Sequence, residues 1–284
     1  MPDPRPPHPA SMTVVEPGRR ITSLQNDSIK AIRALEMRKM RRETGHFVAE
    51  GASVLLTARE QGWSPRTLVL GPEAGANAAT PGLLAWARAA GAEILDVAAP
   101  VLAKLAAKEN PQSVMAVLEQ RWLGPPAPEQ AGSEALWLAL EEVRDPGNLG
   151  TIIRTADAAG AAGIMLVGQT CDPYAREAVR ASMGSIFAVP LVRLEVPAFL
   201  ALAGRWPGDV AGTHLSGKTD YREARYRAPA LLVMGSEGSG LSDAAAAACR
   251  HLVRIPMAGR LDSLNLAVAT ALMLYEIQRP KLRI

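Results

Sequence analysis

Three stretches near the C-terminus decide the fold: LLVMGSEGSGLSD at 231–243, HLVRIPMAG at 251–259 and SLNLAVATALMLYE at 263–276. The first two begin as apolar strands and run into glycine-containing loops, and the first loop contains Gly235, Gly238 and Gly240. Glycine lets the main chain approach a ligand closely and offer its N–H and C=O groups. The pattern therefore predicts a small slot walled by backbone, suited to a flat heteroaromatic ligand.

The helix expected after Ser263 is apolar on nearly every face, from Leu264 to Ile277. A helix without a polar face must be buried all round. Since this part of the chain is a domain of ordinary size, the pattern favours packing of the helix against a second subunit as well as its own sheet. The alternative is a central helix in the core of a monomer.

Strands and helices alternate along the rest of the chain, which is typical of α/β domains. The proline-rich start at 1–20 is expected to be disordered, an α/β domain is expected at 21–120, and a proline- and glycine-rich linker at 121–134. The first helix of that domain is expected as one piece over 28–42. In the second domain, 135–284, apolar strands with intervening helices predict a mostly parallel sheet covered on both faces. Its six strands are expected at 135–143, 163–168, 187–192, 209–214, 231–235 and 251–256.

Composition places the chain among globular proteins, since 48% of its residues are hydrophobic and 21% are charged. Cys171 and Cys249 lack CxxC spacing and the histidines form no metal-binding pair, so neither a disulfide framework nor a metal site is expected. No apolar run reaches the roughly 20 residues of a membrane span. The N-terminus also lacks the apolar region of a signal peptide, and we expect a cytoplasmic protein.

Basic residues gather between Arg19 and Arg42, where eight Lys or Arg residues stand against two acidic ones. Such a cluster is either a solvated helix face or a contact for nucleic-acid phosphates. The net charge of +3 by itself only hints at a polyanionic partner.

Context argues against three common motifs. GTHLSGKT at 212–219 fits the phosphate-binding P-loop pattern, but a P-loop needs an apolar helix next, and the following segment is charged and stops at Pro229. The loop at 235–240 lacks Rossmann spacing, and no GxSxG elbow precedes a matching Asp and His. An ATP-using protein that depends on Lys218 is therefore a minor alternative.

The stretch EEVRDPGNLGTIIRTA at 141–156 is the second strong signal. Asp145 or Asn148 can cap the start of a helix, which places Arg154 about one turn into it. An arginine between apolar residues is either a salt-bridged structural residue or a fork that reaches an anion at the carboxyl edge of the sheet.

The stretches NLGTIIRTADAAG at 148–160, LVMGSEGSGLSD at 232–243 and IPMAGRLDSLNLAVATALMLYE at 255–276 resemble the three ordered motifs of the SpoU family of RNA 2'-O-ribose methyltransferases, in the SPOUT superfamily. The resemblance implies a C-terminal trefoil knot, a rare exception to unthreaded topology, and S-adenosyl-L-methionine (AdoMet) as cofactor. Residues 21–51 and 102–119 are similar to the small ribosomal-protein-like RNA-binding domain that precedes the catalytic domain in many members.

The resemblance also assigns site residues. Those expected near the reacting ribose are Asn148, Arg154, Glu237, Ser263 and Asn265. Those expected to hold AdoMet are Thr213, Gly235, Ser236, Gly238, Gly240, Ile255, Met257, Leu264 and Asn265. Contact with RNA is expected from Arg41, Arg42, Arg180 and Ser182. Structural roles stay open for Glu237, as a carboxylate binding loop N–H groups, for Ser263, as a helix N-cap, and for Arg180, as part of an exposed salt bridge.

The implied reaction is in-line transfer of the AdoMet methyl group to a ribose 2'-oxygen of structured RNA, with 23S rRNA preferred and tRNA second. Because a guanidinium is almost never deprotonated, we expect Arg154 to bind a phosphate and stabilise the developing alkoxide rather than to act as a base. Members of the family are commonly homodimers, which agrees with the apolar helix. The alternative function is a non-catalytic RNA-binding protein on the same fold, and the intact Asn148, Arg154, Glu237 and Asn265 set argues against it.

Overall fold

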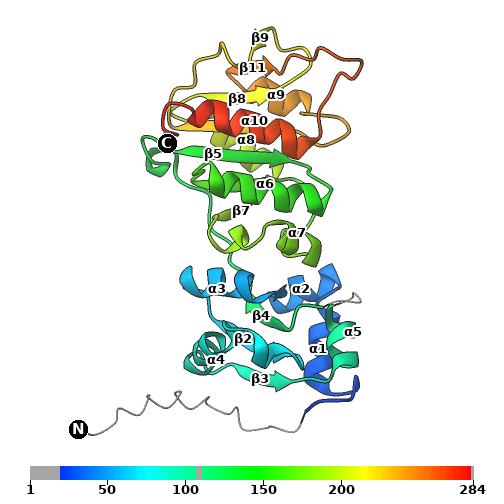
Figure 1. Ribbon diagram of the computed structural model, residues 1–284. Coiled ribbons are helices and arrows are strands. Elements are labelled where there is room, and N and C mark those ends of the chain that lie inside the picture. The colour runs from blue at the N-terminus through cyan, green and yellow to red at the C-terminus, as the bar shows by residue number, and fades with distance from the viewer. Residues whose placement is uncertain (1–19, 107–110, 283–284) are drawn as a thin grey trace, which may run out of the picture.

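The computed structural model describes residues 20–106 and 111–282, which form two α/β units around separate sheets (Figure 1). The first sheet has the order β1-β4-β2-β3, in which β4 is antiparallel to both neighbours and β3 is parallel to β2. Its strands are β1 (His46–Glu50), β2 (Pro65–Leu70), β3 (Glu93–Asp96) and β4 (Val114–Glu119). The helices around it are α1 (Asp27–Ala34), α2 (Arg38–Thr44), α3 (Ala52–Glu60), η1 (Ala74–Ala76), α4 (Thr80–Ala89) and α5 (Ala99–Ala106).

Alternating side chains of this sheet enter two different apolar layers. Phe47 and Leu68 belong to the layer that includes α3 and α4, whereas Val48 and Val69 pack with α1 and α5. Both faces are therefore covered. The proline-rich start predicted at 1–20 falls almost wholly outside the described residues, as do residues 107–110 and 283–284.

The prediction of one continuous helix over 28–42 is wrong, because the chain breaks between α1 and α2. The guanidinium of Arg41 donates to the backbone carbonyls of Leu35 and Glu36, at 2.7 and 2.8 Å. These carbonyls follow the end of α1, where helical partners run out. The Arg41 side chain of α2 thus provides hydrogen-bond donors for these two carbonyls. The amphipathic spacing of the sequence does not reveal this break between the helices.

The second sheet has seven strands in the order β7-β6-β5-β10-β8-β11-β9, and every described pairing in it is parallel. The expected mostly parallel sheet is confirmed. Its strands are β5 (Leu136–Glu141), β6 (Gly163–Val167), β7 (Leu191–Leu194), β8 (Val210–Thr213), β9 (Thr219–Asp220), β10 (Ala230–Met234) and β11 (His251–Arg254). The two-residue strand β9 was not predicted, since it is too short to show a periodicity. The strand expected at 187–192 begins only at Leu191, because Phe187 still belongs to a 3-10 helix.

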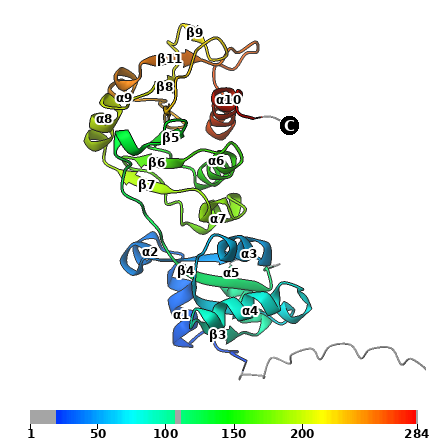
Figure 2. The ribbon, with the colours of Figure 1, turned by 90° about the vertical axis from the view of Figure 1, so that its left-hand side faces the viewer.

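Helices cover both faces of this sheet. One face carries α6 (Pro146–Ala158), α7 (Arg176–Ala181) and α10 (Leu266–Gln278), and the other carries α8 (Val196–Gly204) and α9 (Asp243–Ala248), as Figure 2 shows. The short 3-10 helices are η2 (Pro128–Gln130) and η3 (Ser185–Phe187). Among the described residues, no helix has the length and apolar character to cross a membrane.

The topology gathers several loops at one edge of the sheet. Since the carboxyl ends of parallel strands lie at the same edge, the loops after β5, β8, β10 and β11 meet there. These loops contain the stretches that the sequence singled out, at 142–148, 214–218, 235–242 and 255–265.

The expectation that the last helix is buried all round is wrong for a single chain. In α10, Met273 and Leu274 are fully buried, but Val268 is 50% and Tyr275 is 47% exposed. The helix packs on α6 and β10 with one face and leaves an apolar stripe at the surface.

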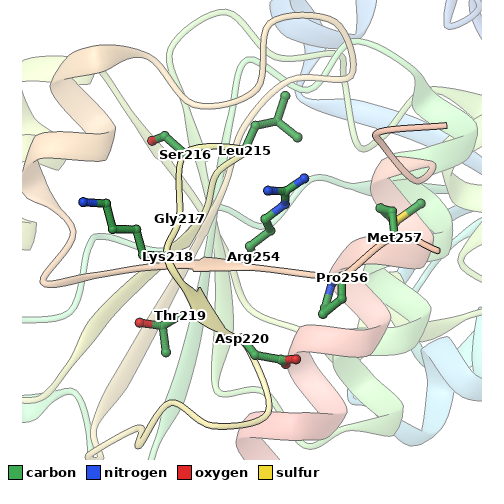
Figure 3. Close-up of a pocket in the computed structure, with 9 residues that line it drawn as sticks. All are labelled: Leu215, Ser216, Gly217, Lys218, Thr219, Asp220, Arg254, Pro256 and Met257. Carbon is green, nitrogen blue, oxygen red and sulfur yellow. The ribbon is translucent and has the colours of Figure 1, made fainter. Parts of the chain in front are cut away.

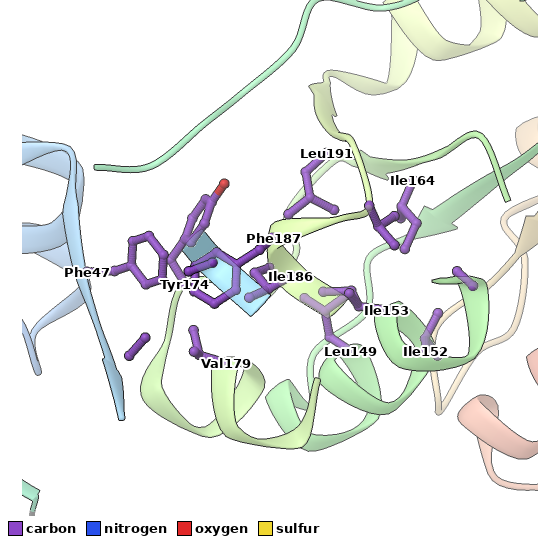
Figure 4. Packing of buried hydrophobic residues seen from close by; sticks show 14 of the residues in the cluster. Phe47, Leu149, Ile152, Ile153, Ile164, Tyr174, Val179, Ile186, Phe187 and Leu191 are labelled. Atoms are coloured by element: carbon purple, nitrogen blue, oxygen red, sulfur yellow. The ribbon is translucent and has the colours of Figure 1, made fainter. Parts of the chain in front are cut away.

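The two units pack together through an apolar and charged interface. Phe47 of β1 lies against Tyr174, with ring centroids 4.6 Å apart (Figure 4). Trp63 meets Phe187 edge-on, with ring centroids 5.1 Å apart. The indole N–H of Trp63 donates to the carbonyl of Phe187 at 2.9 Å. Within this interface Arg41 forms an ion pair with Asp172 at 2.7 Å, and the two side chains are only 6% and 8% exposed.

Candidate active site

A cavity of about 330 Å³ opens where the loops after β8, β10 and β11 meet. We call it the loop cavity. Its volume lies in the range typical of small-molecule sites. It contains every predicted AdoMet-binding residue except Asn265, and it also contains Glu237 and Ser263. The sequence did not single out several other residues that line it, namely His214, Leu215, Met234, Val253, Arg254, Asp262, Leu266, Ala269 and Ser239.

Glycine is required where the loop after β10 folds back on itself. A Cβ atom on Gly235 would lie 2.0 Å from the backbone carbon of Gly240, closer than any real contact. Ser236 and Gly240 exchange backbone hydrogen bonds, both at 3.1 Å, which close the loop. Gly240 has a φ of +69°, which other residues rarely adopt. The backbone thus forms one wall of the loop cavity.

Glu237 joins this loop to the start of α6. Its carboxylate accepts hydrogen bonds from the backbone N–H groups of Arg144 and Asp145 and from the side-chain amide of Asn148, each at 3.2 Å. Burial raises the pKa of the Glu237 carboxyl, but hydrogen bonds from backbone N–H groups and from Asn148 outweigh it and leave the pKa below its ordinary value. Glu237 is therefore ionised at neutral pH, and its structural reading, a carboxylate on loop N–H groups, holds in this structure.

The three sequence motifs meet through two asparagines. The side-chain amide of Asn265 donates to the side-chain oxygen of Asn148 at 2.9 Å. Asn265 also caps α10 by accepting from the N–H of Ala267 at 2.9 Å, and Asp145 caps α6 by accepting from the N–H of Asn148 at 2.6 Å. The alternative role of Ser263 as N-cap is therefore wrong, because the helix begins after Asn265. The Glu237–Asn148–Asn265 chain holds the three loops in one arrangement.

Asn148 and Asn265 lie at the head of a second, open depression of about 660 Å³ between α6 and α10, which we call the outer groove. Along α6 it is lined by Thr151 and Thr155, and along α10 by the exposed apolar stripe. Four of the five predicted catalytic residues thus divide between two neighbouring hollows, with Glu237 and Ser263 on the loop cavity and Asn148 and Asn265 on the outer groove.

Arg154 lies on the exposed side of α6 and lines neither hollow. Among the described residues, it forms no hydrogen bond or ion pair, so its reading as a salt-bridged structural residue is wrong. Its position is about 60° around the helix from Thr151, because successive residues are offset by about 100°. Arg154 therefore stands at the edge of the outer groove with a free guanidinium.

The structure gives most of the predicted RNA-contact residues other partners. Arg41 is buried at the interface with Asp172, and Ser182 is fully buried and donates to the carbonyl of Val179 at 2.7 Å. Arg180 bonds the carboxylate of Glu50 at 2.6 Å. The expectation of RNA contact is therefore wrong for Arg41 and Ser182, whose side chains face the interior. Arg180 is part of an ion pair between the two units. Arg42 is exposed, and its contact with RNA stays a prediction.

An open pocket of about 670 Å³ adjoins the loop cavity and shares Leu215, Arg254 and Met257 with it (Figure 3). The P-loop-like segment borders this pocket. After Gly217 the chain enters strand β9 and pairs with β11, instead of beginning a helix. Lys218 and Arg254 extend to different sides of the pocket in Figure 3. The geometry of a P-loop is absent from this described segment, as the sequence context indicated.

The thiols are unsuited to nucleophilic catalysis. Burial, with nearby Glu237 and Asp145, raises the pKa of Cys171 to about 12. Burial, with nearby Glu141, raises the pKa of Cys249 to about 12 as well. Both thiols are therefore protonated at neutral pH. In the described part of the chain, no three His, Cys, Asp or Glu residues are grouped as metal ligands.

A parallel α/β unit with a glycine-walled cavity at its carboxyl edge, joined to a smaller α/β unit, is an arrangement typical of enzymes that bind a nucleotide-like cofactor. Residues 135–275 match the model of the SpoU rRNA Methylase family, and residues 26–116 match that of the MRM3-like substrate binding domain. The chain belongs to the SpoU family, and it is an AdoMet-dependent methyltransferase.

Individual relatives extend over nearly the whole chain. A 23S rRNA (uridine(2479)-2'-O)-methyltransferase of Streptomyces viridochromogenes is 34% identical, with 93% of each chain covered. A 23S rRNA (guanosine(2553)-2'-O)-methyltransferase of Bacillus subtilis is 28% identical, over 92% of this chain and 99% of the relative. The crystal structure of an AdoMet-bound rRNA methyltransferase from Sinorhizobium meliloti is 44% identical, with a TM-score of 0.85, over 93% of this chain and 99% of that one. The expected family and cofactor are confirmed.

Proposed function

We propose that the protein methylates a ribose 2'-hydroxyl of ribosomal RNA, with 23S rRNA as the substrate, in the cytoplasm. The observation that carries this proposal is the convergence of Asn148, Glu237 and Asn265 beside the loop cavity. The curated relatives named above act on 23S rRNA at a uridine and at a guanosine. Because those two nucleosides differ, we expect the target base to be selected by the surrounding RNA rather than by a pocket for one base.

The residues of the loop cavity fit AdoMet. Apolar side chains of Met234, Ile255 and Leu264 supply flat contact surface, and the backbone around Gly235 offers N–H and C=O groups to a heteroaromatic ring. When bound, AdoMet supplies a methyl group on a positively charged sulfur. The ionised carboxylate of Glu237 borders the same cavity and favours a cationic ligand.

We assign positioning roles to the polar residues between the two hollows. Asn148 and Asn265 hold the loops together and present side-chain amides at the head of the outer groove, where a ribose can approach. Holding the hydroxyl and the methyl donor in line lowers the barrier through orientation. Ser263 lines the loop cavity without capping the helix, so its hydroxyl is available to a ligand.

Arg154 is assigned to the RNA rather than to the cofactor. Its guanidinium is exposed and outside the loop cavity, where it can bind a phosphate of the substrate and stabilise the developing alkoxide. Arg154→Ala should lower the rate of methyl transfer at least 100-fold, roughly the effect of losing one such donor. AdoMet affinity, measured by calorimetry, should stay within about twofold of the original. A loss confined to AdoMet affinity would contradict the assignment.

We further propose a homodimer that covers the apolar stripe of α10. Val268, Leu272 and Tyr275 are exposed along the outer groove, and a contiguous apolar surface of this kind marks an interaction site. A second copy seated there would also enclose Arg154 at the edge of the groove. Light scattering should give twice the chain mass, and Leu272→Glu should give the single-chain mass.

We also propose the trefoil knot of this superfamily, formed by the segment that runs from β10 through α10. Two arrangements support it: β10 inserts between β5 and β8, and α10 then returns across α6. We also assign residues 21–120 to RNA binding, since 26–116 match a substrate-binding domain model.

Transfer of radiolabelled methyl groups from AdoMet to total RNA tests the function. The original protein should label large-subunit rRNA, whereas Asn148→Ala should label it at a small fraction of that rate. RNA binding without any methyl transfer would instead favour the non-catalytic alternative.

A further inference from the structure

Glu141, the last residue of β5, carries a buried carboxylate that is 5% exposed. One carboxylate oxygen accepts from the backbone N–H of Ser242 at 2.8 Å, and the other accepts from the Ser242 hydroxyl at 2.6 Å. Burying a carboxylate is costly unless donors compensate for the lost water. Both bonds go to a single residue, so Ser242 provides that compensation.

Ser242 lies just after the loop at 235–240 that walls the loop cavity. It follows Leu241, which is 5% exposed in the core, and it caps α9 by accepting from the N–H of Ala245 at 3.1 Å. The glycine-walled loop at 235–240 comes directly before it. A residue that fixes Ser242 therefore fixes the end of the loop that walls the loop cavity.

Two carboxylates connect the segments 141–148 and 235–242, and each segment contributes one of them. Glu141 reaches from 141–148 to Ser242, and Glu237 reaches from 235–242 to the N–H groups of Arg144 and Asp145. Ionised acceptors form stronger hydrogen bonds than neutral ones. The loop is thus held at its middle by one carboxylate and at its end by the other, before any ligand binds.

We propose that Glu141 is a positioning residue for AdoMet, acting through Ser242 to pre-form the loop cavity. Glu141 lines neither hollow and so does not touch the cofactor itself. A pre-formed loop reduces the ordering that binding would otherwise require. The inference rests on the proposed AdoMet site in the loop cavity.

Calorimetric titration of AdoMet into Glu141→Gln and Glu142→Gln tests the inference. The side chain of Glu141→Gln has the same size but is neutral, and its NH₂ group cannot accept the hydrogen bond that one of the two Ser242 donors makes to the carboxylate. It should weaken AdoMet binding about tenfold or more, since a charged hydrogen bond is lost. The neighbouring Glu142 is the matched control, because its carboxylate is 43% exposed and pairs with exposed Arg144 at 3.5 Å. Glu142→Gln should bind AdoMet within about twofold of the original protein.

Ser242→Ala and Ser242→Thr give a second, independent readout. Ser242→Thr keeps the hydroxyl and should keep the KM for AdoMet, whereas Ser242→Ala should raise it several-fold. Affinity for rRNA should not change in either variant, because the loop lies in the cofactor site. A purely structural role would instead lower the melting temperature and leave the AdoMet affinity of the folded variant unchanged.

The outcomes separate the inference from the proposed function. Equal AdoMet affinity in Glu141→Gln and Glu142→Gln overturns the role of Glu141 and leaves the proposed function intact. Absence of AdoMet binding by the original protein overturns both. A selective loss of AdoMet affinity in Glu141→Gln, together with a KM for AdoMet that is kept in Ser242→Thr and raised in Ser242→Ala, supports the inference.

Discussion

Asp172→Asn tests the finding that Arg41 is an interdomain residue. The Arg41 guanidinium bonds Asp172 at 2.7 Å, and Asp172 also accepts from the backbone N–H of Tyr174 at 2.9 Å. The amide of the variant has one oxygen and one NH₂ group. Its NH₂ group must therefore face either the Arg41 guanidinium or the N–H of Tyr174, and both of these groups are donors. Removing one partner of a buried ion pair costs about 3–5 kcal/mol, because the other charge is left buried and uncompensated.

We expect a loss near the lower limit, about 3 kcal/mol, since Arg41 keeps its bonds to the carbonyls of Leu35 and Glu36. For a protein of this size, that corresponds to a fall in melting temperature of about 6–12 °C. Urea unfolding followed by tryptophan fluorescence, to which Trp63 in the interface contributes, measures the change in the free energy of unfolding.

Glu119→Gln is the matched control. It removes the Arg66–Glu119 pair, in which both side chains are more than 60% exposed, so the free energy of unfolding should change by less than about 1 kcal/mol. A loss of less than about 1 kcal/mol in Asp172→Asn as well would refute the reasoning, because the interface pair would then behave like a surface pair.

Three further predictions concern the site. Gly235→Ala should abolish AdoMet binding, because its Cβ would lie 2.0 Å from backbone, whereas Gly238→Ala, which meets nothing within 4 Å, should bind AdoMet by calorimetry. The lowered pKa of Glu237 means that its hydrogen bonds are fully present above the ordinary pKa of about 4.3 and are lost only as pH falls through the lower folded value. AdoMet affinity should therefore be independent of Glu237 titration between about pH 5 and 8, and a loss centred near pH 6 would contradict this assignment. Cys171→Ser should retain methyl transfer in the presence and absence of a thiol reagent, because the thiol is protonated and has no catalytic role.

The sequence predicted the site best where the residues that form it lie in one short loop. The spacing of Gly235, Gly238 and Gly240 predicted a backbone-walled cavity, and the structure has a cavity lined by all three. The parallel sheet followed from the alternation of apolar strands with helices.

Residues whose partners are distant in the chain were misread. The basic pattern around Arg41 suggested phosphate contact, but its partner Asp172 lies 131 positions away and becomes visible only in the folded interface. No role was predicted for Glu141 or Ser242, because these partners are 101 positions apart and meet only in the folded chain. For α10, an apolar composition predicted burial all round, but Val268 is exposed in the single chain.

The most direct test of the central claim is to locate the methyl group that the protein transfers. Ribosomal RNA from a strain lacking the protein would be incubated with the purified chain and labelled AdoMet, and the modified position would be mapped by resistance to alkaline cleavage and by mass spectrometry of nucleosides. We expect a single 2'-O-methylated nucleoside in 23S rRNA, and we expect it to be lost with Asn148→Ala. Label on a base, or no label in the presence of bound AdoMet, would contradict it.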